Sequence, residues 1–90
     1  MTFEKHQSVY VLKYMNKYFK AVSCANSLYD YLTDDVSEAT KYSFKQGVEN
    51  LIKRYKNFEP RYGTEFYIKE IISNAEIKKL VIDSKGYVDD

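Results

Sequence analysis

The amino-acid sequence predicts an all-α fold: a compact bundle of two long antiparallel helices and two or three short ones, in one domain over residues 1–90. Two observations lead to this prediction. Apolar residues recur at helical spacing in two long segments, residues 3–22 and 36–57. Residues that stop a helix or form turns, Pro60 and Gly63, then separate the second segment from the rest of the chain.

The first long helix is expected over residues 3–22. At about 100° per residue, one face of this helix carries Val11, Leu12, Met15, Phe19 and Val22. Three tyrosines follow beside that face at a spacing of four residues: Tyr10, Tyr14 and Tyr18. Lysines occupy the opposite side, at Lys13, Lys17 and Lys20. The apolar and aromatic arc is therefore wider than one packing partner requires.

The second long helix is expected over residues 36–57. The periodic pattern breaks near residues 23–26, and a short helix over residues 27–32 precedes the long one. Asp35 and Glu38 have the spacing of a capping box, which marks a helix start. The apolar stripe of the long helix comprises Phe44, Val48, Leu51, Ile52, Tyr55 and Phe58.

The C-terminal third predicts one helix over residues 65–73, with Tyr67, Ile68, Ile71 and Ile72 on one face. Ser73 and Glu76 resemble a second capping box, which predicts another short helix after them. Residues 80–88 leave an alternative open, because Leu80–Ile82 also fits a strand followed by a hairpin turn at residues 83–86. The acidic tail is expected to fray from about residue 87.

No residue pattern indicates an enzyme, a metal site or a cofactor site. His6 is the only histidine and Cys24 the only cysteine, and no orienting motif surrounds either. The three glycines are isolated, so no phosphate-binding loop is predicted. The acidic run lacks the glycine and the spacing of a calcium loop; it comprises Asp30, Asp34, Asp35 and Glu38.

The start of the chain does not resemble a signal peptide, and no apolar run reaches the roughly 20 residues of a membrane span. A lone cysteine fits a reducing compartment. We therefore expect a cytoplasmic protein that has no membrane partner. The frequent use of Lys, Tyr, Asn and Ile is typical of an AT-rich genome, such as that of a low-GC bacterium, a phage or a plasmid.

The leading functional interpretation is a small non-enzymatic protein-interaction module that binds a larger protein as an inhibitor, immunity protein or regulatory protein. Its basis is the ten tyrosines, because tyrosine supplies apolar area and a hydroxyl at interfaces. The expected contact residues are Tyr10, Lys13, Tyr14, Lys17, Tyr62 and Tyr67. A second aromatic patch is expected near residues 58–67, where Phe58 and Phe66 lie close to Tyr62 and Tyr67. The tyrosine stripe could also form a homodimer.

Two alternatives remain open at this point. The tyrosine stripe could be an ordinary part of a thin core. The chain could instead be a nucleic-acid-binding accessory protein, since aromatic and basic residues together can stack bases and contact phosphates. The basic residues for that function are Lys20, Lys45, Lys53, Arg54 and Lys56. A net charge of only +1 and only two arginines make nucleic acid the second choice.

Overall fold

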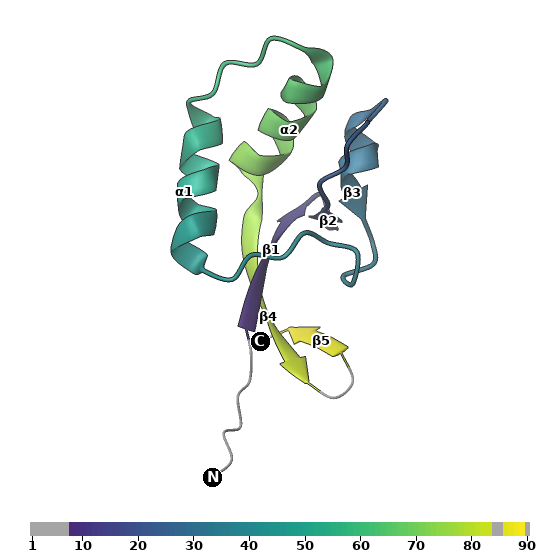
Figure 1. Ribbon diagram of the computed structural model, residues 1–90, viewed down its shortest axis with the longest axis vertical. Helices are drawn as coiled ribbons and strands as arrows, with labels where there is room; N and C mark the ends of the chain where they lie inside the picture. The colour runs from purple at the N-terminus through teal and green to yellow at the C-terminus, as the bar shows by residue number, and fades with distance from the viewer. Residues whose placement is uncertain (1–7, 84–85, 90) are drawn as a thin grey trace.

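The computed structural model describes residues 8–83 and 86–89, and they form a five-stranded antiparallel sheet with two α-helices (Figure 1). The strands are β1 (Ser8–Tyr14), β2 (Lys17–Phe19), β3 (Leu32–Thr33), β4 (Glu76–Asp83) and β5 (Gly86–Asp89). The helical elements are the 3-10 helix η1 (Leu28–Tyr31), α1 (Lys45–Lys56) and α2 (Gly63–Asn74). The strand order is β3-β2-β1-β4-β5. The all-α helical bundle predicted from the sequence is therefore wrong.

The largest correction concerns the first predicted helix, which is a β-hairpin. β1 pairs with β2 through Tyr14 opposite Lys17 and Lys13 opposite Tyr18. Met15 and Asn16 form the two-residue connection, with φ values of 52° and 64°. Positive φ at both central positions is the geometry of a type I′ turn, whose twist matches that of the two strands. Residues 3–7 of the predicted helix lie outside the described residues.

The tyrosine spacing fits a strand as well as a helix. A spacing of four is close to the helical period, but it is also an even number, so Tyr10 and Tyr14 share one face of β1. The neighbouring core residues Val11 and Leu12 point to opposite faces and are both 0% exposed. Because both faces of β1 are covered, the strand lacks the polar alternation that would have identified it.

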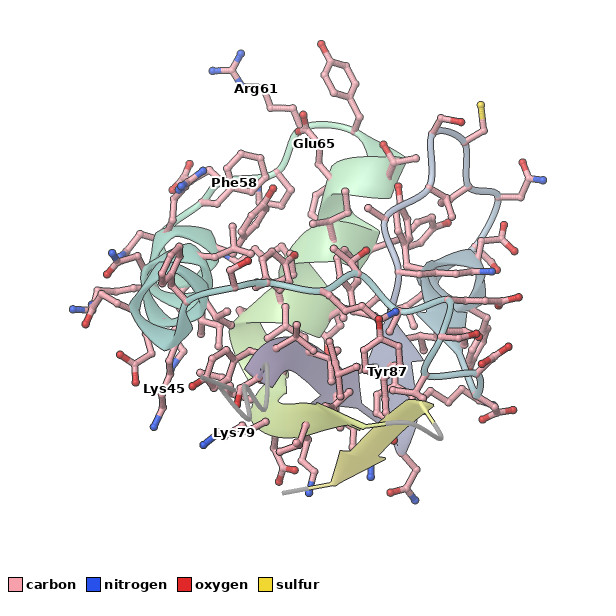
Figure 2. The ribbon with its side chains drawn as sticks, turned by 60° about the horizontal axis from the view of Figure 1, so that its bottom comes forward. Lys45, Phe58, Arg61, Glu65, Lys79 and Tyr87 are labelled. Carbon is pink, nitrogen blue, oxygen red and sulfur yellow. The ribbon has the colours of Figure 1, made fainter. Side chains whose placement is uncertain are left out.

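The two faces of the sheet are covered differently. The helix-covered face packs against α1, α2 and η1, and its buried core comprises Leu12, Phe19, Tyr31, Leu32, Val48, Ile71 and Ile72. On the other face Val11 and Leu80 pack with Ala39, which belongs to the loop before α1. The same loop places the Lys41 ammonium 4.8 Å from the centre of the Tyr87 ring, beside which the loop passes in Figure 2.

Helix α1 begins at Lys45 rather than at residue 36. Asp35 and Glu38, whose spacing predicts a capping box, lie in a tight turn instead. Asp35 accepts hydrogen bonds from the backbone and the hydroxyl of Ser37, and these bonds lower the pKa of its carboxyl group. Thr33 donates to Glu38 over 3.0 Å. Side-chain bonds of this kind compete with helix formation, and they leave the loop free to cover the second face of the sheet.

The C-terminal third agrees better with the sequence. The helix predicted over residues 65–73 is confirmed as α2 (Gly63–Asn74). The hairpin alternative for the chain end is also confirmed, since β4 pairs with β5 and Asp83 lies opposite Gly86. The short helix predicted after the second capping box is wrong, because β4 begins at Glu76 and pairs with β1 along six residues. The predicted acidic tail falls within β5 up to residue 89, and residue 90 lies outside the described residues.

The hairpin turn provides a test of this fold. Met15 is a non-glycine residue in the left-handed region, which costs roughly 1 kcal/mol. We expect Met15→Asn to raise the free energy of unfolding by about 0.5–1 kcal/mol, because asparagine tolerates this conformation and is preferred in type I′ turns. Met15→Val, which is β-branched, should lower it. Urea denaturation of both variants checks the prediction, and equal stabilities would contradict the turn.

The start of α1 provides a second test. Its N-cap residue is Phe44, which has extended φ and ψ angles, makes no capping hydrogen bond and is 75% exposed. Phe44→Ser should add about 1 kcal/mol of stability, because a serine hydroxyl can accept a bond from a free N–H of the first turn. Thermal unfolding should show a melting temperature several degrees higher. Phe44→Ala removes the same ring without adding a cap, and it should show no such gain.

Candidate functional site

Large apolar side chains are exposed on α2 and on the two elements that flank it, η1 and the β1–β2 hairpin. Met15 lies in the turn, Tyr29 on η1, Tyr62 at the N-cap of α2 and Phe66 in its first turns, and all four are more than half exposed. Phe44, the fifth such side chain among the described residues, stands apart at the start of α1. Figure 1 shows α2 between α1 on one side and the η1–β3 segment on the other.

A hydrogen bond ties the sheet to this part of α2. The Tyr14 hydroxyl, at the end of β1, donates to the Glu70 Oε2 atom over 2.7 Å. This bond, partial burial and the negative charge of Glu70 raise the pKa of the Tyr14 phenol. Tyr29 lies on η1, which packs against α2. Tyr14 and Glu70 therefore meet although they come from separate elements, and a third element, η1, lies against the same helix.

The outer side of α2 continues this surface. Tyr62, Phe66 and Glu70 follow one another at intervals of one helical turn. Ile71 and Ile72 are buried and fix the opposite side of α2 against the core. We call this set the aromatic surface, and it comprises the exposed side chains of Met15, Tyr29, Tyr62 and Phe66 and the half-buried side chain of Tyr14. The core contacts of α2 leave the rings of Tyr62 and Phe66 exposed to solvent.

An open groove adjoins the aromatic surface at Tyr14. Its volume is about 410 Å³, and its lining residues are Lys13, Tyr14, Met15, Asn16, Asn74 and Glu76. The groove lies between the hairpin turn and the end of α2, where the chain passes into β4. Most of its lining is polar, so it could accept a polar extension of a ligand whose apolar part covers the aromatic surface.

The residues predicted to bind a protein do not form a single surface. Tyr10, Tyr14 and Tyr67 all pack against the helix-covered core, and of these only Tyr14 bonds to Glu70 on the outer side of α2. Lys13 lies on the other face of the sheet, with its ammonium 5.7 Å from the centre of the Tyr18 ring. Lys17 pairs with Asp34 at 2.8 Å. Only two of the predicted residues, Tyr14 and Tyr62, belong to the aromatic surface.

Sequence reasoning did not identify Met15, Tyr29 or Glu70 as part of this surface. A helical period places Met15 on a core face, but its segment is a strand followed by a two-residue turn. Glu70 meets Tyr14, and η1 with Tyr29 packs against α2, only through tertiary contacts. One feature of the sequence does indicate that Tyr29 is exposed: it falls outside the apolar positions of the short helix predicted over residues 27–32.

The basic residues of α1 are arranged differently. Lys45, Lys53 and Arg54 are exposed, as is Lys56 in the last turn. Glu49 lies one turn from both Lys45 and Lys53 and divides their charge. Figure 2 shows Lys45 and Lys79 pointing outward at the edge of the molecule. Lys20 does not belong to this group, because its ammonium is 3.9 Å from Glu38 on the loop before α1.

Within the part of the chain that the structure describes, no three His, Cys, Asp or Glu side chains are grouped so that they could hold a metal ion. Cys24 is exposed at the turn before η1, and His6 lies outside the described residues. Among the described helices, none is long and apolar enough to cross a membrane.

Comparison with known proteins identifies no relative of this chain. No protein-family model matches the sequence, no curated protein matches it, and no solved structure matches the fold. The functional interpretation therefore depends on the geometry and chemistry of the surface described above.

The Tyr14–Glu70 bond can be tested by titration. The raised pKa means that the folded state favours the protonated phenol, so this stabilisation is fully present below the ordinary value of 10.0 and is lost as pH rises through the folded pKa. We expect Glu70→Ala to lower the pKa of Tyr14 toward that value, as measured from the ring carbon shifts by NMR. Glu49→Ala, which removes an exposed carboxylate of α1, should leave it unchanged. An unaltered pKa in Glu70→Ala would contradict the hydrogen bond.

Proposed function

We propose that this chain is a protein-binding module and that the aromatic surface is its contact surface. The observation that supports this most is that four large apolar side chains, each more than half exposed, lie on α2 and on the two elements that flank it, η1 and the β1–β2 hairpin. Single exposed apolar residues are common on protein surfaces, but adjoining ones mark sites of interaction. Tyrosine, phenylalanine and methionine are also the residue types that interfaces favour.

The scaffold beneath the surface suits this function. Tyr62 and Phe66 project from a helix whose inner side is buried in the core. Tyr14 is held in place by its bond to Glu70. Side chains that are already ordered lose little conformational freedom when a partner binds, so more of the binding free energy is retained. Complete burial of one large apolar side chain contributes about 1.5–3 kcal/mol, and two such anchors would provide a substantial part of a specific affinity.

The module would act by occupying a surface of a larger protein, as an inhibitor, an immunity protein or a regulatory subunit does. The described residues support binding at the aromatic surface in particular, since Tyr10 and Tyr67 are engaged in the core. The homodimer considered from the sequence would use the same surface, and measuring the mass of the particle in solution distinguishes the two arrangements.

The test is capture of partner proteins from a lysate of the source cells, using a Tyr62→Ser/Phe66→Ser double variant. Both side chains are well exposed, so the variant should keep its fold, as circular dichroism would verify. We expect at least a tenfold loss of the captured protein, because exposed aromatic anchors commonly contribute 2 kcal/mol or more. Phe44→Ser makes the same chemical change outside the aromatic surface and should retain full capture. Equal capture by the double variant and the wild type would refute the proposal.

The same experiment addresses nucleic acid as the alternative partner. The four exposed cations on α1 favour that alternative. If nuclease treatment removes every captured protein, and Lys53→Ala/Arg54→Ala has the same effect, then α1 rather than the aromatic surface is the functional site. Binding through phosphates would also fall steeply as salt concentration rises, whereas binding through aromatic anchors would fall much less.

A further inference from the structure

Glu70 is an exposed carboxylate within the aromatic surface. Its Oε2 atom accepts one hydrogen bond, from Tyr14. Phe66 lies one turn before it on α2, and Tyr29 lies on η1, which packs against α2. A carboxylate has about four lone-pair sites, so most of the accepting capacity of Glu70 is free for a ligand. Aromatic rings next to a carboxylate make a favourable environment for a cation, since the faces of the rings carry partial negative charge.

The lysines nearest to Glu70 are engaged elsewhere. Lys69, the adjacent residue on α2, donates to the Phe58 carbonyl oxygen over 2.6 Å. Lys17, which pairs with Tyr14 across the hairpin, is bonded to Asp34. Lys13 lies over the Tyr18 ring on the other face of the sheet. Within the described part of the chain, Glu70 therefore has no cationic partner, although three lysines lie within a few residues of it or of Tyr14.

Further acidic groups lie on η1, at the start of α2 and at the start of β4. Asp30 on η1 accepts hydrogen bonds from the backbone of Asn26 and Ser27. Glu65 accepts one from the backbone of Arg61 at the start of α2, where Figure 2 shows the Arg61 side chain pointing outward. Glu76 lines the adjoining groove. These carboxylates would attract a basic partner surface, since complementary charge steers association and selects partners.

From this arrangement we propose that Glu70 receives an arginine side chain of the bound protein, with Tyr29 and Phe66 flanking the guanidinium group. This inference rests on the proposed function, because it names the chemistry that the aromatic surface recognises. Arginine fits better than lysine for two reasons. A planar guanidinium forms paired hydrogen bonds with a carboxylate, and it stacks on aromatic rings. The partner therefore presents a basic surface with an arginine at its centre.

The test uses a small probe, so that it does not depend on identifying the partner. N-acetyl-arginine methylamide is titrated into the ¹⁵N-labelled protein, and its neutral counterpart N-acetyl-citrulline methylamide is the matched control. We expect the arginine probe to shift the amide signals of Glu70, Phe66 and Tyr29 with millimolar affinity, and the citrulline probe to shift them at least tenfold less. Glu70→Gln should reduce the response to the arginine probe by tenfold or more, whereas Glu49→Gln on α1 should not change it.

Equal shifts from the two probes, or an unchanged response in Glu70→Gln, would overturn arginine recognition. A stronger response to N-acetyl-lysine methylamide would overturn the choice of arginine over lysine. The outcome is separate from that of the capture experiment. If the probe fails while Tyr62→Ser/Phe66→Ser still loses its captured protein, the aromatic surface binds protein but without an arginine at Glu70. If the probe binds and the double variant captures as well as the wild type, the proposed function fails.

Discussion

The fold depends on the pairing of β1 with its two neighbours. β1 lies at the centre of the sheet and pairs with β2 along one side and with β4 along the other. Its register with β4 brings Ser8 opposite Val81, which joins two distant parts of the chain. Val11 and Leu12 point to opposite faces of the strand and are both fully buried. Each face therefore has its own cover: helices on one side, and the loop before α1 on the other.

The candidate site follows from the same strand. The end of β1 places Tyr14 against α2, where its hydroxyl donates a hydrogen bond to Glu70. The turn that follows must reverse the chain in two residues, which leaves Met15 exposed at the tip. Because one side of α2 is buried in the core, Tyr62 and Phe66 on its outer side are exposed to solvent. The aromatic surface is thus a consequence of how the hairpin and the second helix meet.

Charge is distributed unevenly over this small molecule. The exposed side of α1 carries four basic residues and one acidic residue, whereas α2 exposes the carboxylate of Glu70. The net charge of +1 does not show the local excess of positive charge on α1. This difference between the two helices favours different partners for them. The single acidic residue within α1, Glu49, weakens the basic side as a phosphate-binding surface, whereas no described lysine or arginine forms an ion pair with Glu70.

The sequence by itself determined the segments whose signals are local: the helix α2, the C-terminal half of the second predicted helix, and the final hairpin as one of two alternatives. It predicted Tyr14 as a surface residue of a helix that does not exist, and Tyr62 as a surface residue of the loop before α2. Tertiary structure alone decided β1 and β2, because a strand buried on both faces shows no alternation and its partner β4 lies more than 60 residues away. It also decided the contact of Tyr14 with Glu70 and the packing of η1 against α2, since no local pattern links residues from a strand, a 3-10 helix and an α-helix.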